Sequence, residues 1–210
     1  TNKAAAEMIS RVEELHGAYP TGLWAGTFHS VANRLLRRYA SELGYTRDFT
    51  ILDREDSESL VKVCIKDAKI DTKTVRFPSA GVVLGLVSYA RNASIGLQEA
   101  LERQPHLERH LDALGSIATL YDKKRRDGNM MDFDDLLLKL LELLNTHSRI
   151  AEMLSERFRF ILVDEFQDTN TVQAAIIRRL AEHHGNLLVV GDDAQSIYSF
   201  RAADIQNILR

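Results

Sequence analysis

The sequence predicts an α/β fold in which part of a parallel sheet is interrupted by a large, all-helical insertion. Two apolar runs of strand length, residues 160–163 and 187–190, each end abruptly in carboxylates and amides. The segment between them is helical in its periodicity, so the whole unit has the length of a parallel βαβ crossover. Ligands of open α/β sheets bind beyond the carboxyl ends of the strands. We therefore expect one site at that edge.

Residues 170–185 predict the crossover helix. Asn170 and Gln173 have the spacing of a capping box, in which each side chain bonds the backbone N–H of the other. Gly185 follows the last periodic position and is expected to end the helical segment. The apolar positions expected on its buried face are Val172, Ala175, Ile176 and Leu180.

The rest of the chain divides into a core domain and an insertion. Residues 1–26 predict a helix followed by a short strand at 23–26. From 27–157 the pattern is mainly helical, and within 47–128 it is helical alone. We expect 1–26 and 158–210 to form parts of one core domain, with 27–157 as a mainly helical insertion domain.

Composition excludes several classes of protein. Cys64 is the only cysteine, which excludes an intrachain disulfide and a cysteine zinc site. No run approaches the roughly 18 apolar residues of a membrane span. The 210 residues have a formal net charge of -3, which neither supports nor excludes binding to nucleic acid. We expect a soluble, cytoplasmic protein without membrane association.

Asp164 and Glu165 are the leading candidates for chemistry. A carboxylate at a strand end can hold Mg²⁺, and a neighbouring glutamate can orient or deprotonate an attacking water. Strand alternation would send the two side chains to opposite faces, so both reach one site only if the strand ends there. Taken alone, such a pair is more often part of a loop of helix caps and solvated acids.

Five blocks in order, at residues 1–5, 26–30, 131–136, 164–170 and 191–201, resemble motifs of superfamily 1 DNA helicases of the UvrD/Rep/PcrA type. The last two resemble the Walker B motif and the coupling motif that follows it. The resemblance spans essentially the whole chain. It implies a P-loop-NTPase-like (RecA-like) parallel sheet and an ATP-dependent DNA helicase, with Mg²⁺ and ATP bound at the acid block.

The resemblance also implies roles for individual residues in ATP hydrolysis. Asp164 matches the magnesium carboxylate, and Glu165 matches the residue that activates the hydrolytic water. Gln195 matches the glutamine that senses the γ-phosphate and links its presence to the DNA groove. All three are therefore candidate catalytic residues, and Asp164 and Gln195 are also candidate nucleotide-binding residues.

A second set of positions matches DNA contacts of the family. Thr27 and His29 fit positions that contact the sugar-phosphate backbone. Tyr198 and Phe200 match an aromatic pair on which single-stranded bases stack, and Phe200 stands where many members have tryptophan. Arg201 matches an arginine near DNA. The expected partners are single-stranded DNA and single/double-strand junctions, with translocation in the 3′ to 5′ direction and duplex unwinding.

The P-loop signature G-x-x-x-x-G-K-[ST] does not occur in the 210 residues, and the chain opens at Thr1 without methionine. In the family, the P-loop precedes the block at residues 1–5. We therefore expect an interior piece of the first motor half of a helicase, and we expect it to be inactive alone.

Two other functions remain open from the residues. A metal-dependent nuclease or phosphatase would need two metals roughly 3.5–4 Å apart, whereas Gln167 and Gln195 suit phosphate sensing better than metal binding. The carboxylates available to it are Asp164, Glu165, Asp168, Asp192 and Asp193. The other alternative is a non-catalytic DNA-binding module.

Two charged clusters are expected to lie outside the site. The acids Asp132, Asp134 and Asp135 are expected to cap a helix and favour its positive N-terminus. The basic run at residues 123–126 is typical of a solvated helix end, with contact to duplex phosphate as the alternative.

Overall fold

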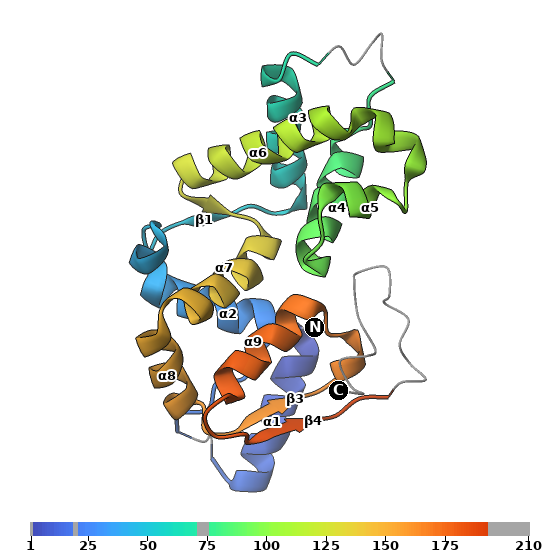
Figure 1. Ribbon diagram of the computed structural model, residues 1–210. Coiled ribbons are helices and arrows are strands. Elements are labelled where there is room, and N and C mark those ends of the chain that lie inside the picture. The colour runs from blue at the N-terminus through green and yellow to red at the C-terminus, as the bar shows by residue number, and fades with distance from the viewer. Residues whose placement is uncertain (1, 19–20, 71–75, 193–210) are drawn as a thin grey trace.

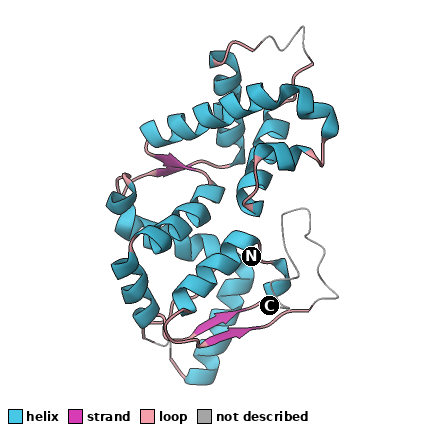
Figure 2. Ribbon diagram, in the orientation of Figure 1, coloured by secondary structure: helices cyan, strands magenta, loops and turns pink. Residues whose placement is uncertain are grey.

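The computed structural model describes residues 2–18, 21–70 and 76–192. This part of the chain is mostly helical and contains two small parallel sheets (Figure 2). The helices are α1 (Asn2–His16), α2 (Phe28–Tyr39), α3 (Arg54–Asp67), α4 (Ala80–Ala93), α5 (Leu97–Leu101), α6 (Leu111–Asp127), α7 (Phe133–Thr146), α8 (Ser148–Arg157) and α9 (Thr171–Ala181), with 3-10 turns η1 (Ala40–Leu43), η2 (Pro105–His110) and η3 (Phe166–Asp168). The strands are β1 (Thr50–Ile51), β2 (Met130–Met131), β3 (Ile161–Val163) and β4 (Leu187–Val189).

The molecule consists of two units stacked along its long axis (Figure 1). The lower unit contains α1, α2, α7, α8 and α9 with β3 and β4, and the upper unit contains α3 to α6. Each unit has its own hydrophobic cluster. In the lower unit, α7 packs against both α2 and α9 and buries the side chains Leu136, Leu137, Leu140, Leu143 and Leu144.

The upper unit packs around Val83, Leu114, Ile117 and Tyr121, which are almost fully buried. Its separate core begins in α3 and ends in α6. Helices α2, α7 and α8 belong instead to the cluster of the lower unit, where they pack with α9. The independently packed helical part therefore lies well inside the predicted insertion at 27–157.

The βαβ prediction is confirmed. β3 and β4 pair in parallel with Ile161 opposite Leu187, and α9 connects them. Asn170 and Gln173 form the predicted capping box, with N···O distances of 2.9 and 3.0 Å. Among the described residues this sheet has two strands, so it shows one βαβ unit of a P-loop-NTPase-like fold and not a complete RecA-like sheet.

Two details of the strand prediction were wrong. The described residues 21–27 form no strand, and Trp24 packs edge-on against Phe158 and beneath the Arg34 guanidinium. Conversely, β1 lies inside the segment 47–128 that was predicted to be helical alone, and it pairs in parallel with β2, which directly follows that segment. The two strands lie where the chain enters and leaves the upper unit. Strands of two residues are too short to produce a periodic signal, and their pairing depends on partners far apart in the sequence.

A network of buried ion pairs connects helices of the upper unit to the start of α7. Asp132 caps α7 and forms a capping box with Asp135, as predicted for these acids. Arg125 from α6, which is 2% exposed, donates to Asp132 at 2.9 Å and pairs with Asp135. Arg91 from α4 pairs with the same two carboxylates. Tyr121 donates to Asp132 at 3.0 Å, and burial first and then the Asp132 charge raise the pKa of its hydroxyl.

A second polar contact joins α4 to the helix after the acid block. The Asn92 Nδ2 donates to Asp134 at 2.7 Å, and Asn170 Nδ2 donates to Asn92 Oδ1 at 2.9 Å. Asn92 thus contacts the first turn of α7 and the N-cap of α9. The upper unit is therefore linked directly to the end of the loop that contains Asp164 and Glu165.

The basic run at residues 123–126 is only partly solvated. Arg125 is buried in the ion network, so the expectation of a solvated side chain was wrong there, because two buried carboxylates lie within its reach. Lys124 pairs with Asp67 at 2.8 Å. Lys123 and Arg126 are exposed, and contact with duplex DNA remains a prediction for these two.

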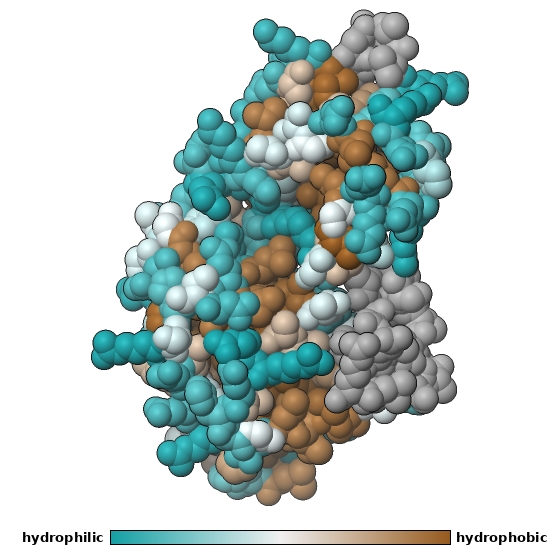
Figure 3. All heavy atoms as spheres, in the orientation of Figure 1, coloured by the Kyte–Doolittle hydropathy of each residue, from teal (hydrophilic) through white to brown (hydrophobic). Residues whose placement is uncertain are grey.

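One face of the β3–β4 sheet is apolar and open to solvent. Phe160 and Leu162 are 74% and 72% exposed, and Leu188 and Val190 are both 56% exposed. Leu162 lies opposite Leu188 in the ladder, so these side chains share one face of the sheet. Figure 3 shows the resulting apolar area over the lower part of the molecule. No helix among the described residues is long and apolar enough to cross a membrane.

Candidate active site

The acid block lies at the carboxyl end of β3. Asp164 and Glu165 directly follow the strand, and both side chains are exposed. The ladder continues one step beyond the strands, since Val190 donates to the Val163 carbonyl at 2.8 Å and Phe166 donates to the Val190 carbonyl at 2.9 Å. The loop after β3 and the loop after β4 therefore meet at one edge of the sheet, as predicted.

Glu165 adopts a left-handed backbone conformation, with φ 52° and ψ 43°. Non-glycine residues in this region cost about 1–3 kcal/mol and cluster at functional sites. Two hydrogen bonds of the Glu165 backbone hold the turn: Glu165 N–H donates to the side-chain Oδ1 of Asp164 at 2.9 Å, and Asp168 N–H donates to the Glu165 carbonyl at 3.0 Å. The turn ends the alternation of the strand, so both acids can lie at the same edge.

Gln167 connects the two loops. Its side chain is 1% exposed, its Nε2 donates to Glu165 Oε2 at 2.5 Å, and its Oε1 accepts from the Asp192 N–H at 3.0 Å. Both ends of the amide are occupied by protein groups, so the structure does not support phosphate sensing for Gln167. Sequence analysis missed this bridge because Asp192 is 25 residues away.

Gly191 allows the close approach of the two loops. A Cβ at this position would lie 2.6 Å from Gln167 Oε1 and 3.3 Å from the Gln167 backbone nitrogen. The first distance is shorter than any ordinary non-bonded contact, so a side chain at position 191 would displace the Gln167 amide from its hydrogen bonds. Glycine at this position is therefore compatible with the bridge.

Asp168 completes the acidic edge. One of its carboxylate oxygens, Oδ1, is buried and has no hydrogen-bond partner among the described residues. Burial raises the pKa of Asp168, and the negative charge of Glu165 raises it further. A buried, unpartnered oxygen in this position favours a bound cation or donor group.

The two described candidates for DNA contact lie at the start of α2, where His29 contacts α7. Thr27 caps α2, and its Oγ1 accepts from Ser30 N at 3.2 Å. The His29 ring packs edge-on against Phe133 at 5.9 Å between centroids. Burial lowers the pKa of His29, and the nearby Asp134 partly opposes that shift. The remaining candidates, Gln195, Tyr198, Phe200 and Arg201, lie outside the described residues.

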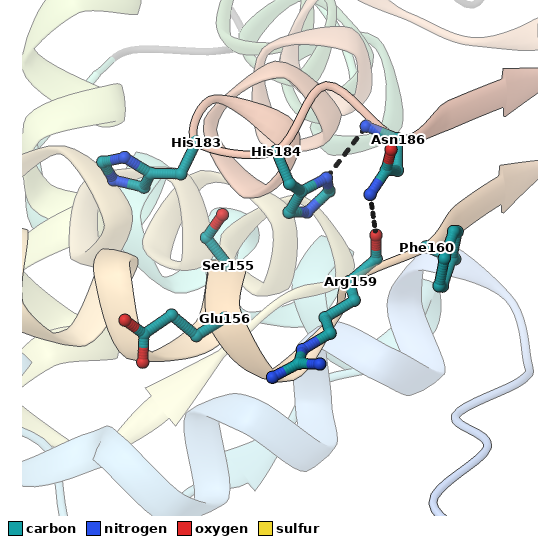
Figure 4. Close-up of a pocket in the computed structure, with 7 residues that line it drawn as sticks. All are labelled: Ser155, Glu156, Arg159, Phe160, His183, His184 and Asn186. Atoms are coloured by element: carbon teal, nitrogen blue, oxygen red, sulfur yellow. Dashed lines mark hydrogen bonds between the residues drawn. The ribbon is translucent and has the colours of Figure 1, made fainter.

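A pocket of about 580 Å³ lies at the opposite end of the strands (Figure 4). Arg159 and Phe160 precede β3 in it, and Asn186 precedes β4 and donates to the Arg159 carbonyl at 2.9 Å. The amino ends of parallel strands are not where ligands of α/β sheets bind. We therefore place the candidate site at the acid block and not in this pocket.

All 210 residues match the family described as the UvrD/REP helicase N-terminal domain. The chain belongs to this family. Among the relatives of this UvrD/REP domain are the ATP-dependent DNA helicases PcrA of Staphylococcus epidermidis (strain RP62A), 38% identical over 209 residues, and of Staphylococcus aureus (strain Mu50), 37% identical over 210 residues. Both alignments cover 100% of this chain, which spans 28% of the length of each relative.

Proposed function

We propose that this UvrD/REP domain is part of an ATP-dependent DNA helicase, and that its acid block forms one side of the ATP site. The observation that supports this most is the exposed Asp164–Glu165 pair at the carboxyl end of β3, within a chain that matches the helicase family over its full length. The match to helicases also disfavours the nuclease or phosphatase and the non-catalytic DNA-binding module.

The residues at this edge fit a magnesium nucleotide. The exposed Asp164 carboxylate and the unpartnered Asp168 Oδ1 are hard oxygen donors of the kind that Mg²⁺ binds. Bound Mg²⁺ and ATP would supply the phosphoryl group and neutralise its charge. Glu165 has an exposed carboxylate next to Asp164 and can accept the proton of an attacking water. Gln195 is proposed to sense the γ-phosphate.

The proposed DNA contacts come from two parts of the chain. Thr27 and His29 lie at the start of α2 and would contact the sugar-phosphate backbone. Tyr198, Phe200 and Arg201 would contact single-stranded bases and phosphate. We propose that the core belongs to a RecA-like sheet domain, that the separately packed α3–α6 unit is the helical insertion, and that the helicase moves 3′ to 5′ toward duplex junctions.

The function is tested in the intact helicase that contains this chain. ATP hydrolysis should require Mg²⁺ and should rise on addition of single-stranded DNA. A duplex with a 3′ single-stranded tail should be unwound, whereas the matched duplex with a 5′ tail should not. Hydrolysis that does not respond to DNA would contradict the helicase proposal, and unwinding from the 5′ tail would contradict the direction.

Replacing Tyr198 or Phe200 with alanine should weaken binding to single-stranded DNA. Each stacked base contributes about 1–3 kcal/mol, which corresponds to roughly 5- to 150-fold in affinity. Fluorescence anisotropy with oligonucleotides of different sequence should show a similar loss for each, because stacking tolerates every base. If the aromatics are instead buried in a core, the variants should lose about 3–5 kcal/mol of stability, which a thermal unfolding control will detect.

A further inference from the structure

Gln167 occupies the junction between the acid block and the loop after β4. Its side-chain amide lies between the Glu165 carboxylate and the Asp192 backbone N–H, and it is almost completely shielded from water. Gly191 brings the second loop so close that a Cβ there would touch the Gln167 Oε1. The bridge is therefore built into the contact between the two loops.

The chemistry of the two partners fixes the orientation of the amide. A carboxylate can only accept, so it must face the Gln167 Nε2, and a backbone N–H can only donate, so it must face Oε1. Reversing the amide would place two acceptors together at Glu165 and two donors together at Asp192. The bond to the carboxylate is charge-assisted, and burial of the amide limits competition from water.

Glu165 needs such a restraint. Its backbone is left-handed, and its side chain is exposed, so without a partner the carboxylate would sample several rotamers. The contacts of its own turn hold only backbone atoms: Glu165 N–H to Asp164, and the Glu165 carbonyl to Asp168 N–H. Gln167 is the described residue that hydrogen-bonds the Glu165 carboxylate itself.

We propose that Gln167 is a positioning residue for ATP hydrolysis, which aims the Glu165 carboxylate and ties it to the backbone of Asp192 in the segment after β4. The inference rests on the proposed function, because it assigns Gln167 an effect on turnover through Glu165. Gln167 is buried and its amide is occupied at both ends, so it does not bind the nucleotide. Its removal should lower kcat and leave the KM for ATP nearly unchanged.

Two substitutions in the intact helicase distinguish the hydrogen bond from Gln167 to Glu165 from the hydrogen bond that Gln167 accepts from Asp192. Gln167→Leu removes both hydrogen bonds at similar volume. Gln167→Glu keeps the length and the acceptor for Asp192 N–H but replaces the donor facing Glu165 with a second acceptor. We expect both to lower kcat on the order of 10- to 100-fold, the size of effect that misplacing a catalytic group by about 1 Å produces. Full turnover in Gln167→Glu would overturn the proposal, even if Gln167→Leu did not fold.

A double-mutant cycle tests whether Gln167 acts through Glu165. In a Glu165→Gln background, the base that Gln167 aims is already gone, so adding Gln167→Leu should cost no further activity. Independent, multiplying losses would show that Gln167 acts by another route and would overturn the proposal.

Gln173→Leu is the matched control. It removes a glutamine amide from the capping box of α9, six residues further along, without contact to Glu165. We expect a similar loss of melting temperature but unchanged kcat. If wild type shows DNA-stimulated hydrolysis that Glu165→Gln abolishes, while both Gln167 variants keep full turnover, the inference fails and the proposed function stands. If wild type shows no DNA-stimulated hydrolysis, the proposed function itself fails.

Discussion

Replacing Glu165 with glutamine should lower the steady-state ATPase rate of the intact helicase by about 10²- to 10⁴-fold, the usual size of effect when a general base is lost. Glutamine keeps the length of the side chain, and its Oε1 can still accept the hydrogen bond from Gln167 Nε2. The left-handed turn at this position is already tolerated by a side chain of that size. The substitution therefore removes the base and little else.

The control for this prediction is the affinity of the variant for nucleotide and for single-stranded DNA. Glu165→Gln should retain affinity for a non-hydrolysable ATP analogue with Mg²⁺ and for single-stranded DNA, both measurable by calorimetry. Near-normal turnover in the variant would show that another group activates the water. Loss of nucleotide affinity together with turnover would instead indicate that Glu165 binds the nucleotide or its cation.

Replacing Arg125 with alanine should lower the free energy of unfolding by about 3–5 kcal/mol, because breaking a buried ion pair leaves the partner charges uncompensated. Asp132 and Asp135 are both buried, and without Arg125 the remaining Arg91 guanidinium would balance only one of their two negative charges. The loss should appear as a lower midpoint in urea unfolding.

Lys123→Ala is the control for Arg125. It lies in the same basic run of α6 but is exposed, and exposed substitutions usually change stability by less than about 0.5 kcal/mol. An Arg125→Ala protein as stable as Lys123→Ala would show that the ion network does not hold the upper unit on α7. A reduced affinity for duplex DNA in Lys123→Ala, without loss of stability, would support the predicted contact of this run.

The features that sequence analysis predicted correctly depend on neighbours in the chain. The capping-box partners Asn170 and Gln173 are three positions apart, and so are Asp132 and Asp135. The strand, helix and strand of the βαβ unit each carry their own periodic signal. Membership in the helicase family followed from blocks of the same local kind.

The features that were missed depend on residues far apart. The bridging role of Gln167 can be recognised only from the structure, which places the Asp192 N–H beside its side-chain amide. Arg125 looks like one member of a basic run, and its burial is decided by Asp132 and Asp135 folding back onto α6. The pairing of β1 with β2 joins residues about eighty positions apart. Such contacts leave no periodic pattern in the sequence.

The stability of the candidate site depends on whether the exposed apolar face of the β3–β4 sheet is covered. Parallel sheets are ordinarily covered on both faces. Burying the exposed parts of Phe160, Leu162, Leu188 and Val190 would contribute about 1–2 kcal/mol each, so the sum is comparable with the whole stability of a small domain. Covering this apolar face would therefore stabilise the folded state of the strands that position the acid block. While the face is exposed, the strands would tend to associate with other apolar surfaces in solution.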